Sequence, residues 1–300
     1  MRTQTIAIAI AGLSFTVAAE AQDKPVQVFT AVGPWAMEYA DDSCRLARNL
    51  TDGQKEATLA LERYTPGGQI TIGIAGDSIR AFRNARETTV SFAPEGAQDQ
   101  SRPLFRSTLS DGRTAFLIPD ASLTQPPDWS EFSPEEIKAM IAKPIVRQEE
   151  IELAKGVSAI KLDHGFLTAV EMQSGSLSGP IKAMHNCIDD LLRHWGLDPE
   201  VQHSLSRRAA PSDGKDLARS FSYPLQPLML GQSGSVRVRL IVAPDGHATE
   251  CHLTGPSAQQ DFINESCRKL TAEAVFDPAL DAEGNPVQSY YATTIHFYIN

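Results

Sequence analysis

Two Asp-Ser dipeptides and one serine-rich run are the residues whose types could support hydrolysis. An aspartic-protease loop places a glycine after Asp-Ser, but Cys44 follows one of these dipeptides and Ile79 follows the other. The run SGSLSG has Leu177 where the pattern Gly-x-Ser-x-Gly requires the nucleophile. We therefore interpret the dipeptides as chance matches and the run as a loop that leads into a helix.

The histidines are not spaced as metal ligands. On a helix His185 and His194 point to opposite sides, and on a strand the odd separation of His247 and His252 makes them diverge. A zinc site needs several ligands that converge from one face. We expect scattered surface histidines, no metal and no cofactor.

Two pairs of adjacent acids could suggest acid-base chemistry. Glu149-Glu150 and Asp189-Asp190 are neighbours in the sequence, and neighbours on a helix point apart. We interpret both pairs as solvated faces and expect no catalytic residue.

The N-terminus is typical of an exported protein. Arg2 precedes an apolar run from Ile6 to about Ala19, and Ala19-Glu20-Ala21 is a small-x-small cleavage site. We predict a signal peptide over residues 1–21, cleaved after Ala21. The alternative is an uncleaved anchor, although the run has about fourteen apolar residues and a bilayer span needs about twenty.

Composition limits the class of partner. The 300 residues carry a formal net charge of −10 and are 42% hydrophobic, which is enough for two domains with cores. An acidic chain is repelled by nucleic acid and by anionic membranes. We expect no nucleic-acid partner, and soluble proteins or peptides fit better.

Residues 22–196 predict a β-rich domain with a packed helix. Strand-like segments alternate with turns such as Pro66-Gly67-Gly68, and Ile70, Ile72 and Ile74 share one strand face. The sheet is expected to be mostly antiparallel, with a short helix capped by Ser133 and Glu136. A second helix from Pro180 to Trp195 has one apolar stripe that should face the sheet. The stripe is Leu177, Ile181, Met184, Ile188, Leu191, Leu192 and Trp195.

Residues 197–222 lose this periodicity and are predicted to be a linker before a second domain at 223–300. That domain has the order helix, strand, strand, helix, strand, which predicts a small α+β sandwich. Its first strand has Val236, Val238, Leu240 and Val242 on one face, and Arg237 and Arg239 on the other. We expect the valine face to be buried and the arginine face to be wet.

Four cysteines in an exported chain are expected to pair, and three pairings are possible. Cys251 lies on a strand face that looks toward the helix carrying Cys267, so these two form the natural pair. Cys44 on a strand is left for Cys187 at the edge of the helical stripe. No C-x-x-C occurs, so thiol exchange is not expected.

The segment from Tyr223 to Ile299 resembles the TonB C-terminal domain family. The matching residues are Tyr223-Pro224, Gly231, Gly234, Asp245-Gly246, Phe276-Asp277-Pro278-Ala279 and Gly284-Asn285-Pro286-Val287. The resemblance implies a periplasmic module of Gram-negative bacteria that pairs a receptor peptide with the edge of its sheet. Edge strands offer unpaired backbone groups for such pairing. The expected edge residues are Gln288, Tyr290, Ala292, Thr294, His296 and Tyr298.

The predicted function is therefore that of a periplasmic binding protein for an outer-membrane receptor or another envelope protein, with a possible link to TonB-dependent transport. The expected cleaved leader and the lack of a long Pro-rich segment argue against energy transduction by this chain. The alternatives are a passive scaffold that forms a homodimer through the terminal strand and, less favoured, a periplasmic hydrolase with its site in the N-terminal domain.

Overall fold

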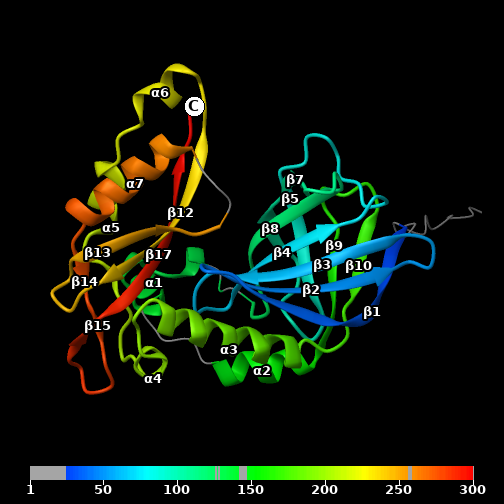
Figure 1. The fold of residues 1–300 in the computed structure, drawn as a ribbon, viewed down its shortest axis with the longest axis horizontal. Helices are drawn as coiled ribbons and strands as arrows, with labels where there is room; N and C mark the ends of the chain where they lie inside the picture. Colours follow the sequence, from blue (N-terminus) through cyan, green and yellow to red (C-terminus); the bar gives the residue numbers. More distant parts are fainter. Residues whose placement is uncertain (1–24, 126, 128, 142–146, 256–258, 300) are drawn as a thin grey trace, which may run out of the picture.

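The computed structural model describes residues 25–125, 127, 129–141, 147–255 and 259–299. The predicted signal peptide therefore lies outside the described residues. Among the described residues, no helix is long and apolar enough to cross a membrane. Strands dominate the N-terminal part, and a smaller strand-and-helix unit follows, which confirms the α+β fold class (Figure 1).

The N-terminal domain is built on a ten-stranded sheet of order β6-β5-β9-β10-β1-β2-β3-β4-β8-β7. Neighbouring strands are antiparallel except for β1 and β10, which are parallel. The strands are β1 (Val26–Tyr39), β2 (Cys44–Thr51), β3 (Glu56–Arg63), β4 (Gln69–Ala75), β5 (Glu87–Pro94), β6 (Gln100–Pro103), β7 (Phe105–Thr108), β8 (Thr114–Ser122), β9 (Val157–Leu162) and β10 (Ala169–Gln173).

The sheet curls so that its β6 end meets β8. The side-chain amide of Gln100 donates to the Ser122 carbonyl (2.8 Å) and accepts from the Ser122 N–H (3.1 Å). The curl encloses the apolar face of the strands, and Ile70, Ile72 and Ile74 are all buried. Alternation along β4 therefore set which side of this strand became the core.

Helices cover one side of the curled sheet (Figure 1). They are α2 (Arg147–Lys155), which contacts β9, and α3 (Ser178–His194), which contacts β1 and β2. A 3-10 turn at Trp129–Glu131 and the helix α1 (Pro134–Ile141) precede them in the chain. All seven residues of the predicted α3 stripe are buried. The predicted capping box of α1 is also confirmed, because Glu136 accepts from the Ser133 N–H (2.8 Å) and the Glu136 N–H lies 3.3 Å from Ser133 Oγ.

Residues 197–222, expected to be a linker, carry short elements that pack on both sides. These are α4 (Pro199–His203), β11 (Ala210–Pro211) and α5 (Gly214–Ser220). Leu197 belongs to the N-terminal core, whereas Leu205 and Ala209 belong to the C-terminal one. Elements this short show no hydrophobic period, which explains why the sequence pattern did not reveal them.

The C-terminal domain is a three-stranded sheet of order β13-β12-β17 with α7 on one face. The elements are α6 (Leu225–Met229), β12 (Gly234–Val242), β13 (Ala248–Leu253), α7 (Gln260–Ala272), β14 (Phe276–Asp277), β15 (Ala279–Leu280), β16 (Pro286–Val287) and β17 (Ser289–Phe297). Figure 1 shows this unit standing beside the curled sheet, with α3 running beneath.

At two positions in this domain, Gly234 and Gly246, the packing leaves no room for a side chain. A Cβ at Gly234 would lie 2.7 Å from the Phe262 ring, which stacks on Phe297 with centroids 4.7 Å apart. Gly246 has φ of +85°, and a Cβ there would lie 2.3 Å from the Phe276 carbonyl oxygen. Both positions bring backbone against packed groups, so any side chain would force the neighbours apart.

Both expected disulfides are present. Cys44 of β2 bonds Cys187 of α3 across 143 residues, and Cys251 of β13 bonds Cys267 of α7 across 16 residues. Each bridge joins a sheet to the helix that covers it.

The two bridges should stabilise the fold unequally. Replacing Cys44 and Cys187 by alanine should lower the free energy of unfolding by roughly 5 kcal/mol, against roughly 3 for Cys251 and Cys267, because the longer loop restricts the unfolded chain more. Urea unfolding followed by circular dichroism measures both, and each double variant serves as the control for the other. A larger loss from the short loop would contradict this ranking.

Candidate functional site

The strand β17 is one edge of the C-terminal sheet, because β12 is its one paired neighbour among the residues that the structure describes. The Thr254 N–H donates to the Arg237 carbonyl (2.9 Å), so the backbone groups of Arg237 point toward β13. Alternate residues of a strand direct their backbone groups to opposite sides. The neighbours of Arg237 in β12, Val236 and Val238, therefore point toward β17.

The register then fixes which groups of β17 point outward. Val236, Val238 and Leu240 are paired with Ile295, Thr293 and Tyr291, which must point back toward β12. The residues between them direct their N–H and C=O groups away from the sheet. These residues are Tyr290, Ala292, Thr294 and His296. Among the described residues, no hydrogen bond reaches their outward backbone groups.

The ends of this edge differ in exposure. The Gln288 carbonyl accepts a hydrogen bond from Gln202 Nε2 of α4 (3.0 Å), which covers the first outward group. Tyr290 is buried, Ala292 and Thr294 are half-buried, and His296 and Tyr298 are exposed. The accessible part of the edge therefore begins at Ala292.

The arginine face of β12 is not wet, which corrects the expectation from the sequence. Arg239 is only 3% exposed: its guanidinium lies 3.8 Å from the centre of the Trp195 ring and 3.3 Å from Asp42 Oδ1. Alternation correctly separated the two faces, but an arginine face can be covered when aromatic rings and carboxylates receive it.

Arg237 makes a second contact with the N-terminal domain. It pairs with Asp120 (2.9 Å) and its guanidinium lies 5.5 Å from the Tyr64 ring centre. Burial raises the pKa of the Tyr64 hydroxyl, so this group is neutral at physiological pH. The face of the C-terminal sheet opposite α7 is thus docked on the N-terminal domain.

Tyr290 anchors the start of β17 in the same interface. Its hydroxyl donates to the Pro66 carbonyl (3.1 Å), and its ring meets the Trp195 ring edge-on, 6.1 Å between centroids. Arg208 Nη2 lies 3.4 Å from the Tyr290 hydroxyl. Tyr290 thus joins the N-terminal core although it was expected to bind a peptide through the edge strand.

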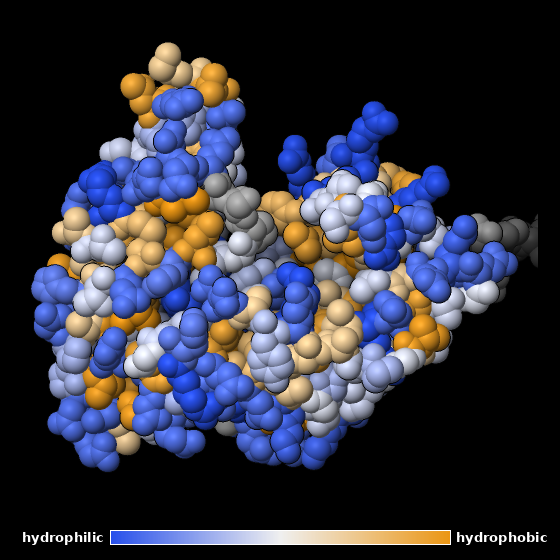
Figure 2. All heavy atoms as spheres, viewed as in Figure 1, coloured by the Kyte–Doolittle hydropathy of each residue, from blue (hydrophilic) through white to orange (hydrophobic). Residues whose placement is uncertain are grey.

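A cleft of about 630 Å³ opens where the docked face ends. One side is Ala292, Thr293 and Thr294 of β17, and the other is the loop from Tyr64 to Gly68 with the start of β4. Arg208, Arg237 and Asp120 bring charge to it. A groove of about 650 Å³ on the outer face of β2, β3, β4 and β8 shares Glu62, Tyr64 and Thr71 with this cleft. Figure 2 shows the surface hollowed between the two domains.

The far end of the C-terminal domain is apolar and exposed. Leu225, Leu228, Met229 and Leu230 are 71%, 48%, 78% and 61% exposed. They lie beside the end of β17, where Ser233 accepts from the Ile299 N–H. Clustered exposed apolar side chains often mark contact surfaces, and this tip is such a cluster at the end of β17.

Glu150 and His185 are buried, which corrects the expectation of solvated acids and surface histidines. Arg63 of β3 donates to both carboxylate oxygens of Glu150 (3.2 and 2.5 Å), and His185 Nε2 lies 2.8 Å from Glu150 Oε2. Burial favours a raised pKa for Glu150, but these hydrogen bonds and the Arg63 charge outweigh it and lower the pKa. A buried acid needs such a cation, and Arg63 is too distant in sequence to be recognised.

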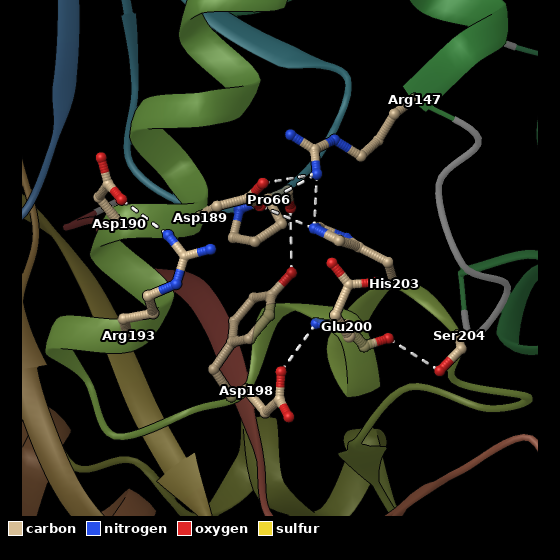
Figure 3. A network of polar contacts seen from close by, with 10 residues as sticks. Pro66, Arg147, Asp189, Asp190, Arg193, Asp198, Glu200, His203 and Ser204 are labelled. Carbon is tan, nitrogen blue, oxygen red and sulfur yellow. Dashed lines mark hydrogen bonds and ion pairs between the residues drawn. The ribbon is translucent and has the colours of Figure 1, made fainter.

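A second network of polar side chains lies nearby and joins the helices α2, α3 and α4 (Figure 3). Asp189 of α3 accepts from Arg147 of α2 (2.9 Å), and His203 Nε2 of α4 lies 2.7 Å from Asp189 Oδ1. Figure 3 shows Arg147 and His203 converging on Asp189 close to Pro66. Among the residues described, no group of three or more His, Cys, Asp or Glu is arranged to hold a metal ion.

The buried histidine should make stability depend on pH. Burial lowers the pKa of His185 in the folded protein, so only the unfolded chain takes up this proton just below pH 6.5. The free energy of unfolding should therefore fall as the pH drops below about 6.5, by up to about 1.4 kcal/mol per pH unit. His185→Gln should remove this slope between about pH 6.5 and 5 in urea unfolding, and the exposed control His252→Gln should keep it. An unchanged slope in His185→Gln would contradict the assignment.

The stability of the interface between the two domains should depend on Arg239 more than on Arg237. Arg239→Ala should lower the free energy of unfolding by about 2 to 3 kcal/mol, because a buried stack and an ion pair are lost together. Arg237→Ala should cost less than about 1 kcal/mol, since its ion pair is partly exposed. Urea midpoints and the rate of proteolysis within residues 197–222 measure both effects. Equal losses would argue against Arg239 as the main contact.

Comparison with known proteins identifies the family of the C-terminal domain. The family described as Gram-negative bacterial TonB protein C-terminal matches residues 219–299, starting four residues before the predicted boundary at Tyr223. None of the curated proteins compared with the chain matches it. The matched segment holds α6, the three-stranded sheet and α7. Residues 219–299 of this chain therefore form a domain of the TonB C-terminal family.

Proposed function

We propose that this protein is an exported, periplasmic envelope protein whose C-terminal domain binds an extended segment of an outer-membrane receptor or another envelope protein. The segment would pair with the outer edge of β17. The signal peptide over residues 1–21 and cleavage after Ala21 are part of this proposal. The N-terminal domain, residues 22–196, holds the C-terminal sheet in a fixed orientation.

The observation that carries the proposal is the row of outward backbone groups at Ala292, Thr294 and His296. Unpaired N–H and C=O groups on an edge strand are satisfied by an added strand, which gains main-chain hydrogen bonds from them. The exposed tip at Leu225 to Leu230 lies at the open end of this strand and offers apolar contact to the same partner.

The same edge could instead pair with a second copy of this chain, as in a dimeric scaffold. The observation that favours the receptor over the second copy is that Tyr290 and Gln288 are covered by the N-terminal domain and α4. A two-fold strand pair would have only the accessible end of β17 to use. Light scattering of the full chain separates the two: a dimer that Thr294→Pro converts to a monomer would favour the scaffold.

A proline pair tests the strand-pairing mode. Thr294→Pro removes an outward N–H that the sheet does not use, whereas Thr293→Pro removes an N–H that faces Val238 of β12. We expect Thr294→Pro to keep its urea midpoint near the wild-type value and to weaken peptide binding at least tenfold, about 1.4 kcal/mol. Thr293→Pro should destabilise the domain instead.

The probes are short synthetic peptides from the plug segments of TonB-dependent outer-membrane receptors, titrated into the full chain and followed by backbone amide NMR. Shifts should concentrate at Ala292, Thr294 and His296. Binding of wild-type strength by Thr294→Pro, or shifts that leave β17 untouched, would refute the pairing mode.

A further inference from the structure

We propose that the N-terminal domain forms the second wall of the strand-pairing site, and that Arg208 in the cleft selects a segment with a carboxylate side chain. This inference rests on the proposed function, because it assigns the chemistry of the partner at the same edge. It gives the N-terminal domain a role in recognition as well as in support.

The position of the cleft requires an added strand to touch both domains. Paired strands lie about 4.8 Å apart, so a strand added beside Ala292 and Thr294 would enter the space bounded by these residues and the Tyr64 to Gly68 loop. The side chains of Ala292 and Thr294 share a sheet face with Tyr290, which is buried against Trp195 and Pro66. Side chains of the added strand on this face would therefore point toward the N-terminal domain.

Most charges along the cleft already have partners. Arg237 pairs with Asp120 (2.9 Å). Glu62 accepts from Ser43 (2.7 Å) and Arg45 (3.1 Å). The charges of Arg237, Asp120 and Glu62 are therefore already balanced by neighbours within the chain.

Arg208 differs from these groups. Its guanidinium carbon lies 5.8 Å from the Tyr290 ring centre and Nη2 lies 3.4 Å from the Tyr290 hydroxyl. Among the described residues, no carboxylate forms an ion pair with it. A carboxylate from the partner can accept two hydrogen bonds from a guanidinium, which strengthens binding and fixes the register of the strand.

The backbone around Arg208 is held in place. Arg207 and Leu280 form an isolated antiparallel bridge, and Arg207 Nη2 also donates to the Pro278 carbonyl (2.9 Å). Arg208 follows directly and lines the cleft together with Thr293 and Thr294. Its position thus depends on folding of the 197–222 segment, not on the partner.

The test uses three acetylated, amidated heptapeptides, Thr-Val-Thr-X-Thr-Val-Thr, in which X is Glu, Gln or Lys. The full chain should bind the Glu peptide at least tenfold more tightly than the Gln peptide of the same shape, and the Lys peptide more weakly still. Arg208→Gln should abolish the Glu preference, and Arg208→Lys should keep part of it. Arg268→Gln on α7 is the matched control, because it removes the same charge outside the cleft and should leave the preference unchanged.

Backbone NMR of the complexes distinguishes failure of the role of the cleft from failure of strand pairing at β17. Shifts at Thr294 and His296 together with Gly67 and Gly68 are expected for the Glu peptide. Shifts in β17 with equal affinities for Glu and Gln peptides, or with Gly67 and Gly68 undisturbed, would overturn the role of the cleft and leave strand pairing intact. If no peptide shifts β17, the proposed function fails with it. Should Arg208→Gln not fold, the wild-type Glu to Gln affinity ratio and the Gly67 and Gly68 shifts still distinguish these outcomes.

Discussion

The arrangement of the two domains depends on one buried cation. Arg239 leaves the C-terminal sheet, stacks on Trp195 at the end of α3 and pairs with Asp42 beside β2. Burying a guanidinium is costly unless a ring face and a carboxylate replace its water, and this interface supplies both. Because Arg239 projects from the middle of β12, its docking orients the whole sheet relative to the N-terminal domain.

That orientation decides which part of β17 is open. Tyr290 follows Arg239 into the interface, so the first outward backbone groups of the edge are covered and the later ones face a cleft. A domain of the TonB C-terminal family thus occurs here with one sheet face closed by a folded partner within the same chain. The accessible part of the edge strand therefore lies beside the Tyr64 to Gly68 loop.

The helices under the curled sheet depend on charges that are also buried. Arg63 on β3 reaches Glu150 on α2 and thereby His185 on α3, while the Cys44–Cys187 disulfide fixes α3 to β2. Removing one member would leave an unpaired charge in the core, so the three act as a unit. Trp195, which receives Arg239, stands at the end of this same helix. Docking of the second domain thus relies on the packing of the first.

The sequence by itself determined the longer strands, the α3 helix and which of their faces are apolar. Alternation identified Ile70, Ile72 and Ile74 as core, helical spacing identified the α3 stripe, and the faces of Cys251 and Cys267 predicted their disulfide. Glycine and turn patterns after Tyr223 were specific enough to indicate the family. These signals are local, since each depends on spacing within one strand, helix or turn.

Only the tertiary structure decided what each polar face meets. From the sequence, the arginine face of β12 was expected to be solvated. Alternation of residue types separates the two faces of a strand but does not say what covers each face. Glu150, His185 and Arg239 find their partners far away in the chain, such as Arg63 at 87 positions from Glu150 and Asp42 at 197 positions from Arg239. Pairing of distant charges depends on the path of the whole backbone, and no local period encodes it.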